Sequence, residues 1–339
     1  MFRSKSSVEQ KNHIGDQTGL ITFEVEFMNL EEIKSKIDFT SINELRIKNK
    51  KIIDYRTTMF LVFNLILFIA LIIFIWPHVE FLLAIFIPLA VVALIYSILY
   101  VLFIRKYEVQ FKKGFRESVI DKLLKNMGYD LKLNIEKPLM QSEFLKGKLY
   151  TSFNVFKPEE LFEGNIDNRP VKFSEILLQT KSRRRTYNVF RGFYANFNYG
   201  LNEDLVIDVI QDDSRDSAFW QKMNLKRDSL IKVNDQDFEK KYVVYSNKPD
   251  VASELLAPKF ITELMTLSNS VNSTIFFSLR NGSIHMCYND GVDHFVIDYN
   301  KTVEQLTENF FMDITKMYNV MKEFKTFIDS NIISIISKH

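Results

Sequence analysis

The sequence predicts an α+β protein in which a two-helix transmembrane hairpin precedes a cytosolic mixed α+β domain with an antiparallel sheet. Residues 57–76 and 81–104 contain no charged side chain, and each stretch is long enough to cross a bilayer core of about 30 Å as a helix. From about residue 140 the pattern changes to strand-like alternation with turn signals, and then to helical spacing. Because strands and helices do not alternate regularly, the class is α+β.

The composition limits the classes of function. The 339 residues carry a formal net charge of +2, so the overall charge predicts no nucleic-acid partner. A single cysteine, Cys287, excludes an intrachain disulfide and fits a reducing compartment. The sequence contains no phosphate-binding loop, nucleophile elbow or dinucleotide fingerprint, so no cofactor and no catalytic site are predicted.

Basic residues on both sides of the hairpin predict its orientation. The link at residues 77–80 has no lysine or arginine. Five basic residues precede the first span and five follow the second: Arg46, Lys48, Lys50, Lys51 and Arg56, then Arg105, Lys106, Lys112, Lys113 and Arg116. Positive residues remain on the cytoplasmic side, so we expect both termini in the cytoplasm. No apolar signal-peptide region precedes the first span.

Two residues inside the spans predict helix interfaces. Asn64 is a polar amide in hydrocarbon, and Pro88 breaks a helical hydrogen bond. The Asn64 amide could pair with Tyr96 or Ser97 of the same hairpin, or with a second copy of the chain. The second alternative predicts a homo-oligomer.

The patterns divide the chain into four segments. Residues 1–40 are polar and expected to be partly disordered. Residues 41–128 form the hairpin and a cytosolic stalk, because apolar residues recur every four positions from 107 to 127. Residues 140–330 form the α+β domain, and residues 331–339 are a tail.

Within the domain, Asn281-Gly282 is the strongest signal and predicts a type I′ hairpin between residues 274–280 and 283–288. Other alternating stretches predict strands at 171–179, 187–197, 205–210 and 241–245, whereas helical spacing predicts helices at 251–267 and 302–328.

Several short motifs together resemble the bacterial family called "domain of unknown function 3137", from about residue 107 to 327. They are VKFSE at 171–175, VFRGFY at 189–194, DFEKKYVVYS at 237–246, LLAP at 255–258 and FFSLRNG at 276–282. Ser253 departs from the family pattern, in which a basic residue is common. The resemblance implies two amino-terminal spans and a bacterial inner-membrane location, and it brings no catalytic residues.

One cluster has the composition of a metal site. His285 and Cys287 would share a strand face, and His294 could return from a following strand near Asp290 and Asp293. The competing interpretation is a polar turn between histidines on strand surfaces. Because paired cysteines and a His-Glu-x-x-His motif are absent, we predict no metal site.

Two further sets of charged residues are candidates. Glu175 and Glu239 could be paired catalytic carboxylates, or they could make structural hydrogen bonds and ion pairs. The basic run Lys181, Arg183, Arg184 and Arg185 could be a solvated loop, or it could contact anionic lipid.

The leading hypothesis is a non-catalytic module anchored in the bacterial inner membrane, whose cytosolic domain binds a protein or small ligand. A ligand-gated oligomeric membrane effector is the first alternative, and an unrecognised hydrolase is the second. The expected partners are the lipid bilayer, a second copy of the chain and an unidentified cytosolic protein or ligand.

Overall fold

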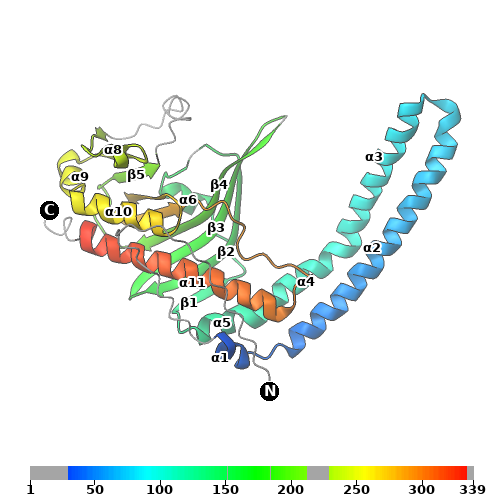
Figure 1. The fold of residues 1–339 in the computed structure, drawn as a ribbon, viewed down its shortest axis with the longest axis horizontal. Coiled ribbons are helices and arrows are strands. Elements are labelled where there is room, and N and C mark those ends of the chain that lie inside the picture. The colour runs from blue at the N-terminus through cyan, green and yellow to red at the C-terminus, as the bar shows by residue number, and fades with distance from the viewer. Residues whose placement is uncertain (1–29, 151, 184, 212–228, 334–339) are drawn as a thin grey trace, which may run out of the picture.

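The computed structural model describes residues 30–150, 152–183, 185–211 and 229–333 (Figure 1). Two long apolar helices lead into a mixed α+β domain with an antiparallel sheet, which confirms the predicted fold class. The expected disorder before residue 30, the end of the predicted tail and Arg184 lie outside the described residues.

The two apolar helices stand away from the domain as an antiparallel hairpin (Figure 1). After the short α1 (Leu30–Ser35), α2 (Thr40–Ile75) runs without a break from the predicted cytosolic segment into the first apolar stretch. A 3-10 turn (Trp76–His78) leads to α3 (Phe81–Leu99). In each helix only 11% of the most apolar 18-residue segment is buried inside the protein, so these are not core helices of a soluble fold. Their exposed apolar surface is compatible with lipid contact.

The predicted stalk is continuous with α3. A π-helical turn (Tyr100–Ile104), α4 (Arg105–Phe115), a second π-turn (Arg116–Ile120) and α5 (Asp121–Asn126) follow one another. A four-residue repeat advances about 40° beyond each α-helical turn, and a wider π-turn absorbs part of that drift. As a result Phe115, Val119 and Leu123 are all fully buried in the domain core. The stalk is therefore part of the domain as well as of the hairpin.

One antiparallel sheet of nine strands organises the described part of the domain. Its order is β1 (Leu131–Asn134), β2 (Val155–Ile166), β3 (Arg169–Lys181), β4 (Thr186–Asn198), β9 (Ser283–Tyr288), β8 (Ile275–Arg280), β5 (Ile207–Gln211), β7 (Tyr242–Ser246) and β6 (Ser229–Ile231). Asn281 and Gly282 have φ of 50° and 71°, as a type I′ turn requires, which confirms the predicted hairpin. The sheet starts before residue 140, because β1 pairs with β2.

Helices cover both faces of the sheet. The short α6 (Gln141–Lys146) lies on one face, where Phe144 packs edge-on against Tyr194. On the other face lie α10 (Pro258–Ser270) and α11 (Val303–Ile328), where Phe324 packs against Phe197 and Phe277. Two shorter helices, α8 (Gln236–Glu239) and α9 (Pro249–Leu255), border β6 and β7.

The single helix predicted at 251–267 is wrong. The chain forms α9 and α10 instead, because Ala257 is extended, with ψ of 155°, before Pro258. Proline disfavours a helical conformation in the residue before it and suits the first turn of a new helix. The helix predicted at 302–328 is confirmed as α11, with Thr302 and Gln305 forming its capping box.

Candidate functional site

The segment between β9 and α11, residues 289–302, connects the sheet to the stalk helix α4, and we call it the α11 loop. At its carboxy-terminal end the hydroxyl of Tyr299 donates a hydrogen bond to the carbonyl oxygen of Tyr107 in α4. The same carbonyl accepts the Asn49 amide of α2 at 3.1 Å. In the first turn of α11, Glu304 accepts a hydrogen bond from the Asn43 amide at 3.0 Å. Arg46 of α2 donates to the carbonyl oxygen of Asn300 at 3.5 Å, so the loop contacts both α2 and α4 outside the apolar stretches.

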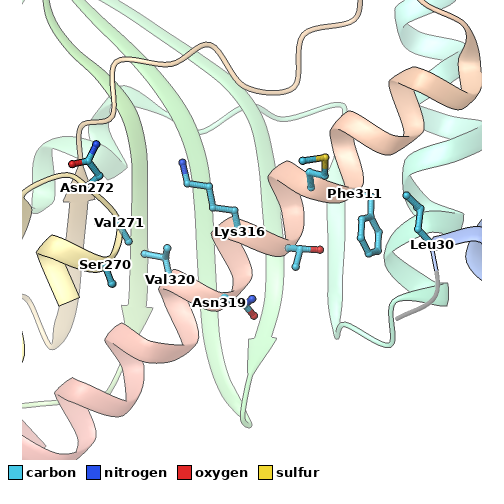
Figure 2. A pocket seen from close by; sticks show the side chains of 10 residues that line it. Leu30, Ser270, Val271, Asn272, Phe311, Lys316, Asn319 and Val320 are labelled. Atoms are coloured by element: carbon cyan, nitrogen blue, oxygen red, sulfur yellow. The ribbon is translucent and has the colours of Figure 1, made fainter. Parts of the chain in front are cut away.

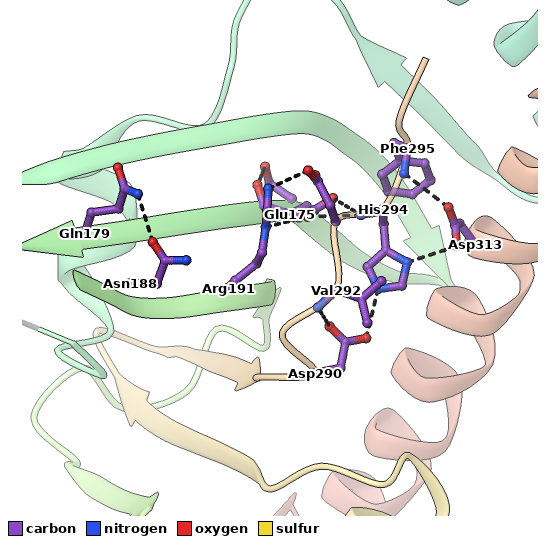
Figure 3. A network of polar contacts seen from close by, with 11 residues as sticks. Glu175, Gln179, Asn188, Arg191, Asp290, Val292, His294, Phe295 and Asp313 are labelled. Atoms are coloured by element: carbon purple, nitrogen blue, oxygen red, sulfur yellow. Dashed lines mark hydrogen bonds and ion pairs between the residues drawn. The ribbon is translucent and has the colours of Figure 1, made fainter. Parts of the chain in front are cut away.

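At its other end the α11 loop is held by buried charged groups (Figure 3). The backbone N–H of His294 donates to the Glu175 carboxylate, with N–O distances of 3.1 and 3.2 Å. Its ring binds two carboxylates, Asp313 of α11 through Nδ1 at 2.9 Å and Asp290 through Nε2 at 2.8 Å. Lys316 of α11 lies 3.2 Å from the same Asp290 carboxylate.

The surroundings move the pKa values of the two central groups. Burial raises the pKa of the Glu175 carboxyl to about 8, against the lowering effect of the His294 N–H. Burial also opposes charge on the His294 ring, but the hydrogen bonds to Asp290 and Asp313 outweigh it and raise the pKa to about 9. At neutral pH a protonated His294 therefore lies between two carboxylates, while Glu175 is mostly neutral.

Arg191 of β4 borders this cluster. Its guanidinium binds Asp293 at 2.8 Å and lies 3.9 Å from Glu175. The Nε–H of Arg191 is buried and has no hydrogen-bond partner among the described residues. A buried donor without a partner is costly, so the cluster has an unused polar group directed at Glu175.

The sheet separates the residues of the predicted metal-like cluster. Tyr194 and Phe193 are consecutive in β4, so their side chains point to opposite faces. Tyr194 binds His285 at 2.8 Å, whereas the ring of Phe193 packs against His294 at 4.8 Å. Cys287 pairs with Tyr194 across the strands and shares the face of His285.

His294 does not return on a strand either, because it lies in the α11 loop. No group of three metal-ligating side chains occurs among residues 30–150, 152–183, 185–211 and 229–333. Burial lowers the pKa of His285 to about 4, so this histidine is a neutral core residue. Burial raises the pKa of the Cys287 thiol as well, and an unreactive thiol is expected there.

The two candidate carboxylates are also far apart. Glu175 lies in β3, whereas Glu239 ends α8 and accepts the Val233 N–H at 2.9 Å. The strand that follows α8 is β7, and in the sheet it lies five strand spacings from β3, which corresponds to roughly 24 Å. The pair cannot act on one bond, and Glu239 has a structural hydrogen bond.

The remaining candidates lie in the β3–β4 hairpin and in the apolar helices. Arg183 and Arg185 are exposed at the turn between β3 and β4. Asn64 and Pro88 are both buried between α2 and α3. The Asn64 amide donates to the Phe60 carbonyl at 2.7 Å and does not bind Ser97, which donates to its own helix.

A pocket of about 430 Å³ lies beside α11, away from the residues that the sequence singled out (Figure 2). Its apolar wall comes from Phe311 and Val320 of α11, Val271 after α10 and Leu30 of α1. Lys316 lies at its border, so one residue belongs both to this pocket and to the charged cluster.

The cluster was not recognisable in the sequence. Glu175 and His294 are 119 positions apart, and their contact depends on how β3, β4 and the α11 loop meet. Asp313 lies in a helix whose sequence reads as an ordinary amphipathic helix. The one local sign of the cluster in the sequence is the polar stretch at 289–293, which is equally typical of a turn between two strands.

A family model described as "protein of unknown function (DUF3137)" matches residues 188–326. This match confirms the family resemblance. It covers β4, the α11 loop and most of α11, and so includes Arg191, His294 and Asp313 but not Glu175. The DUF3137 description assigns no activity to these residues.

Among solved structures, the chain is similar to the "mycobacterial trehalose monomycolate transport factor A, TtfA", with 10% identity. The similarity covers 64% of this chain and 92% of that chain, with a TM-score of 0.35, and carries no functional inference at that score. A comparison with the curated proteins gives no match.

Proposed function

We propose that this protein is a non-catalytic module anchored in the bacterial inner membrane, which holds a binding domain at the cytoplasmic face. The observation that carries the proposal is the combination of two exposed apolar helices with a rigid attachment to the domain. Only 11% of the most apolar 18-residue segment of each helix is buried, whereas the stalk that continues α3 contributes fully buried residues to the domain core. The domain therefore has a fixed position relative to the hairpin.

Both termini are cytoplasmic in this proposal. The basic residues flanking the two apolar stretches support that orientation, because lysine and arginine favour the cytoplasmic side. Reporter fusions at residue 50 and after residue 110 should both report the cytoplasm, and a reporter in the link at 77–80 should report the outside. A periplasmic signal from the fusion after residue 110 would contradict the proposal.

A second candidate is a gated membrane effector in which the domain controls the hairpin. The α11 loop favours it, because one end binds the charged cluster through His294 and the other binds the stalk through Tyr299. A ligand or proton that changes the cluster would act on a segment attached to both apolar helices. One hairpin cannot enclose a pore, so this candidate requires several copies.

Conductance across planar bilayers distinguishes the two candidates. The purified full chain should leave a bilayer silent if it is only an anchored module. Currents that disappear in Tyr299→Phe, which lacks the hydroxyl that reaches α4, would favour the gated effector. Mass photometry in detergent supplies the number of copies for either case.

We retain self-association as part of the proposal, although Asn64 does not support it. The Asn64 side chain is 4% exposed and faces α3, so it is not presented to a second hairpin. A homo-oligomer would instead use the exposed apolar faces of α2 and α3. Aromatic and branched side chains such as Phe74 and Leu94, which are 73% and 62% exposed, lie on those faces.

A further inference from the structure

The turn between β3 and β4 carries an exposed basic surface, which we call the basic tip and define as Lys181, Arg183 and Arg185. No aspartate or glutamate occurs between Glu175 and Glu203, so the part of the hairpin beyond Glu175 contains no acidic residue that could neutralise the tip. Tyr187 next to it is 52% exposed. Arginine, lysine and tyrosine together are typical of the headgroup region of membranes.

Hydrogen bonds among the described residues join the two sides of the turn that carries the basic tip. The backbone N–H of Ser182 donates to the Arg185 carbonyl at 2.8 Å, and the Ser182 hydroxyl donates to the same carbonyl at 3.1 Å. Asn154, just before β2, accepts the Lys181 N–H at 2.7 Å and donates to its carbonyl at 2.8 Å. These bonds connect Lys181, Ser182 and Arg185 to their neighbours, and the side chains of Lys181, Arg183 and Arg185 are exposed.

The tip lies on the membrane side of the domain. The β3–β4 hairpin extends beyond the rest of the sheet on the same side as the α2–α3 hairpin (Figure 1). The turn and the apolar stretches therefore lie on one side of the domain, so the tip faces the bilayer that the hairpin is proposed to cross.

We propose that the basic tip docks on the anionic phospholipid headgroups of the bilayer that the α2–α3 hairpin crosses. This inference rests on the proposed membrane anchorage. Docking gives the domain a second contact with the membrane, so the sheet is held at two separated points. Each basic residue near an anionic surface should favour the docked state about fivefold.

The test uses the full chain in lipid nanodiscs with a nitroxide label at Thr186→Cys, next to the tip. Cys287 is buried and should remain unlabelled. In discs of equal phosphatidylcholine and phosphatidylglycerol we expect the label to be protected from a water-soluble nickel relaxant, and in phosphatidylcholine alone we expect it to be exposed. The double variant Arg183→Gln, Arg185→Gln should reduce the ratio of docked to free label about twenty-five-fold.

A matched control removes the same charge elsewhere. Lys259 and Lys322 are exposed on α10 and α11, so Lys259→Gln with Lys322→Gln should leave the protection at Thr186 unchanged. Equal loss of protection in this control would show that overall charge, not the tip, sets the result, and would overturn the proposal. Protection by inorganic phosphate in phosphatidylcholine discs would overturn it too, because the tip would then bind a free anion.

A second label separates this inference from the proposed anchorage. Leu65 is 59% exposed in α2, so a label at Leu65→Cys should collide with oxygen dissolved in lipid. If the Leu65 label is embedded in lipid but the Thr186 label is exposed to water in the anionic discs, the docking proposal is overturned and the anchorage proposal stands. A Leu65 label outside the lipid overturns the anchorage and the docking together.

Discussion

Replacing Glu175 with glutamine should remove most of the loss of domain stability at high pH. The Glu175 side chain is 1% exposed, and burial raises its pKa from the ordinary 4.5 to about 8. Between those two pH values the folded state binds a proton that the unfolded state has released. The stabilising effect of that proton is complete below about pH 4.5 and is lost as pH rises through about 8. Glutamine cannot ionise, and its carbonyl oxygen can still accept the His294 N–H.

The size of the effect follows from the shift. At about 1.36 kcal/mol per pH unit, a rise from 4.5 to about 8 corresponds to at most about 5 kcal/mol between acidic and alkaline pH. A domain of this size changes its melting temperature by about 2–4 °C per kcal/mol, so the parent should melt on the order of 10 °C lower at pH 9 than at pH 5. His294 acts in the same direction, because its raised pKa also makes stability fall between about 6.5 and 9.

The assay is thermal unfolding of the detergent-solubilised full chain, followed by near-ultraviolet circular dichroism from pH 5 to pH 9. Glu175→Gln should match the parent at pH 5 and exceed it at pH 9. Glu163→Gln is the control, because Glu163 of β2 pairs with Lys172 and its pKa is lowered by that contact. The control should retain the decline seen in the parent above pH 7. A parent whose melting temperature is flat from pH 5 to 9, or a Glu175→Gln variant with the same decline, would refute the reasoning.

Three further substitutions test other parts of the structure. Arg280→Met leaves the buried Asp208 carboxylate without its bidentate partner and should lower the unfolding free energy by about 3–5 kcal/mol in a denaturant titration. The double variant Asp208→Leu, Arg280→Met should regain much of that free energy. No loss in the single variant would contradict the pairing. Gly147→Ala would place a Cβ 2.7 Å from the Cβ of His285 and should lower stability by about 1–3 kcal/mol in the same titration, whereas an unchanged midpoint would show that α6 can move. Asn64→Leu removes a buried Oδ1 that has no partner in the described part of the chain, so it should raise the melting temperature without changing the mass-photometry distribution. A shift toward monomer would instead return Asn64 to an interface between copies.

The apolar helices and the main hairpin could be predicted because their signals are local. Absence of charge over twenty residues, or Asn-Gly between two alternating stretches, is decided by neighbours in the chain. The strands β1 and β2 were missed for the opposite reason. In residues 155–166 buried and exposed side chains do not alternate strictly, because a bulge between Pro158 and Leu161 shifts the register. A bulge moves side chains to the other face, so a period-two search fails there.

The candidate chemistry failed for a reason of geometry rather than of composition. The sequence grouped His285 with His294 because they are nine positions apart, but the sheet lies between them. The actual partner of the His294 N–H, Glu175, comes from a strand more than a hundred positions earlier. Nearness in sequence predicts contact between residues of one β-hairpin. It no longer predicts contact when the chain leaves the strand and continues as a loop on one face of the sheet, as it does between His285 and His294.

The α11 loop is held at its two ends by different kinds of contact, and this difference decides where a signal could enter. At the stalk, Tyr299 and Asn49 donate to the Tyr107 carbonyl, and these neutral groups do not change between pH 5 and 9. At the sheet, Glu175 and His294 have pKa values of about 8 and about 9, so the charge there changes in that interval. Loss of these protons as pH rises can therefore loosen the sheet end while the stalk end stays attached. The α11 loop would then move between the sheet and the stalk while the stalk keeps its contacts in the domain core, and a gated effector needs such a movable segment whereas a simple anchor does not.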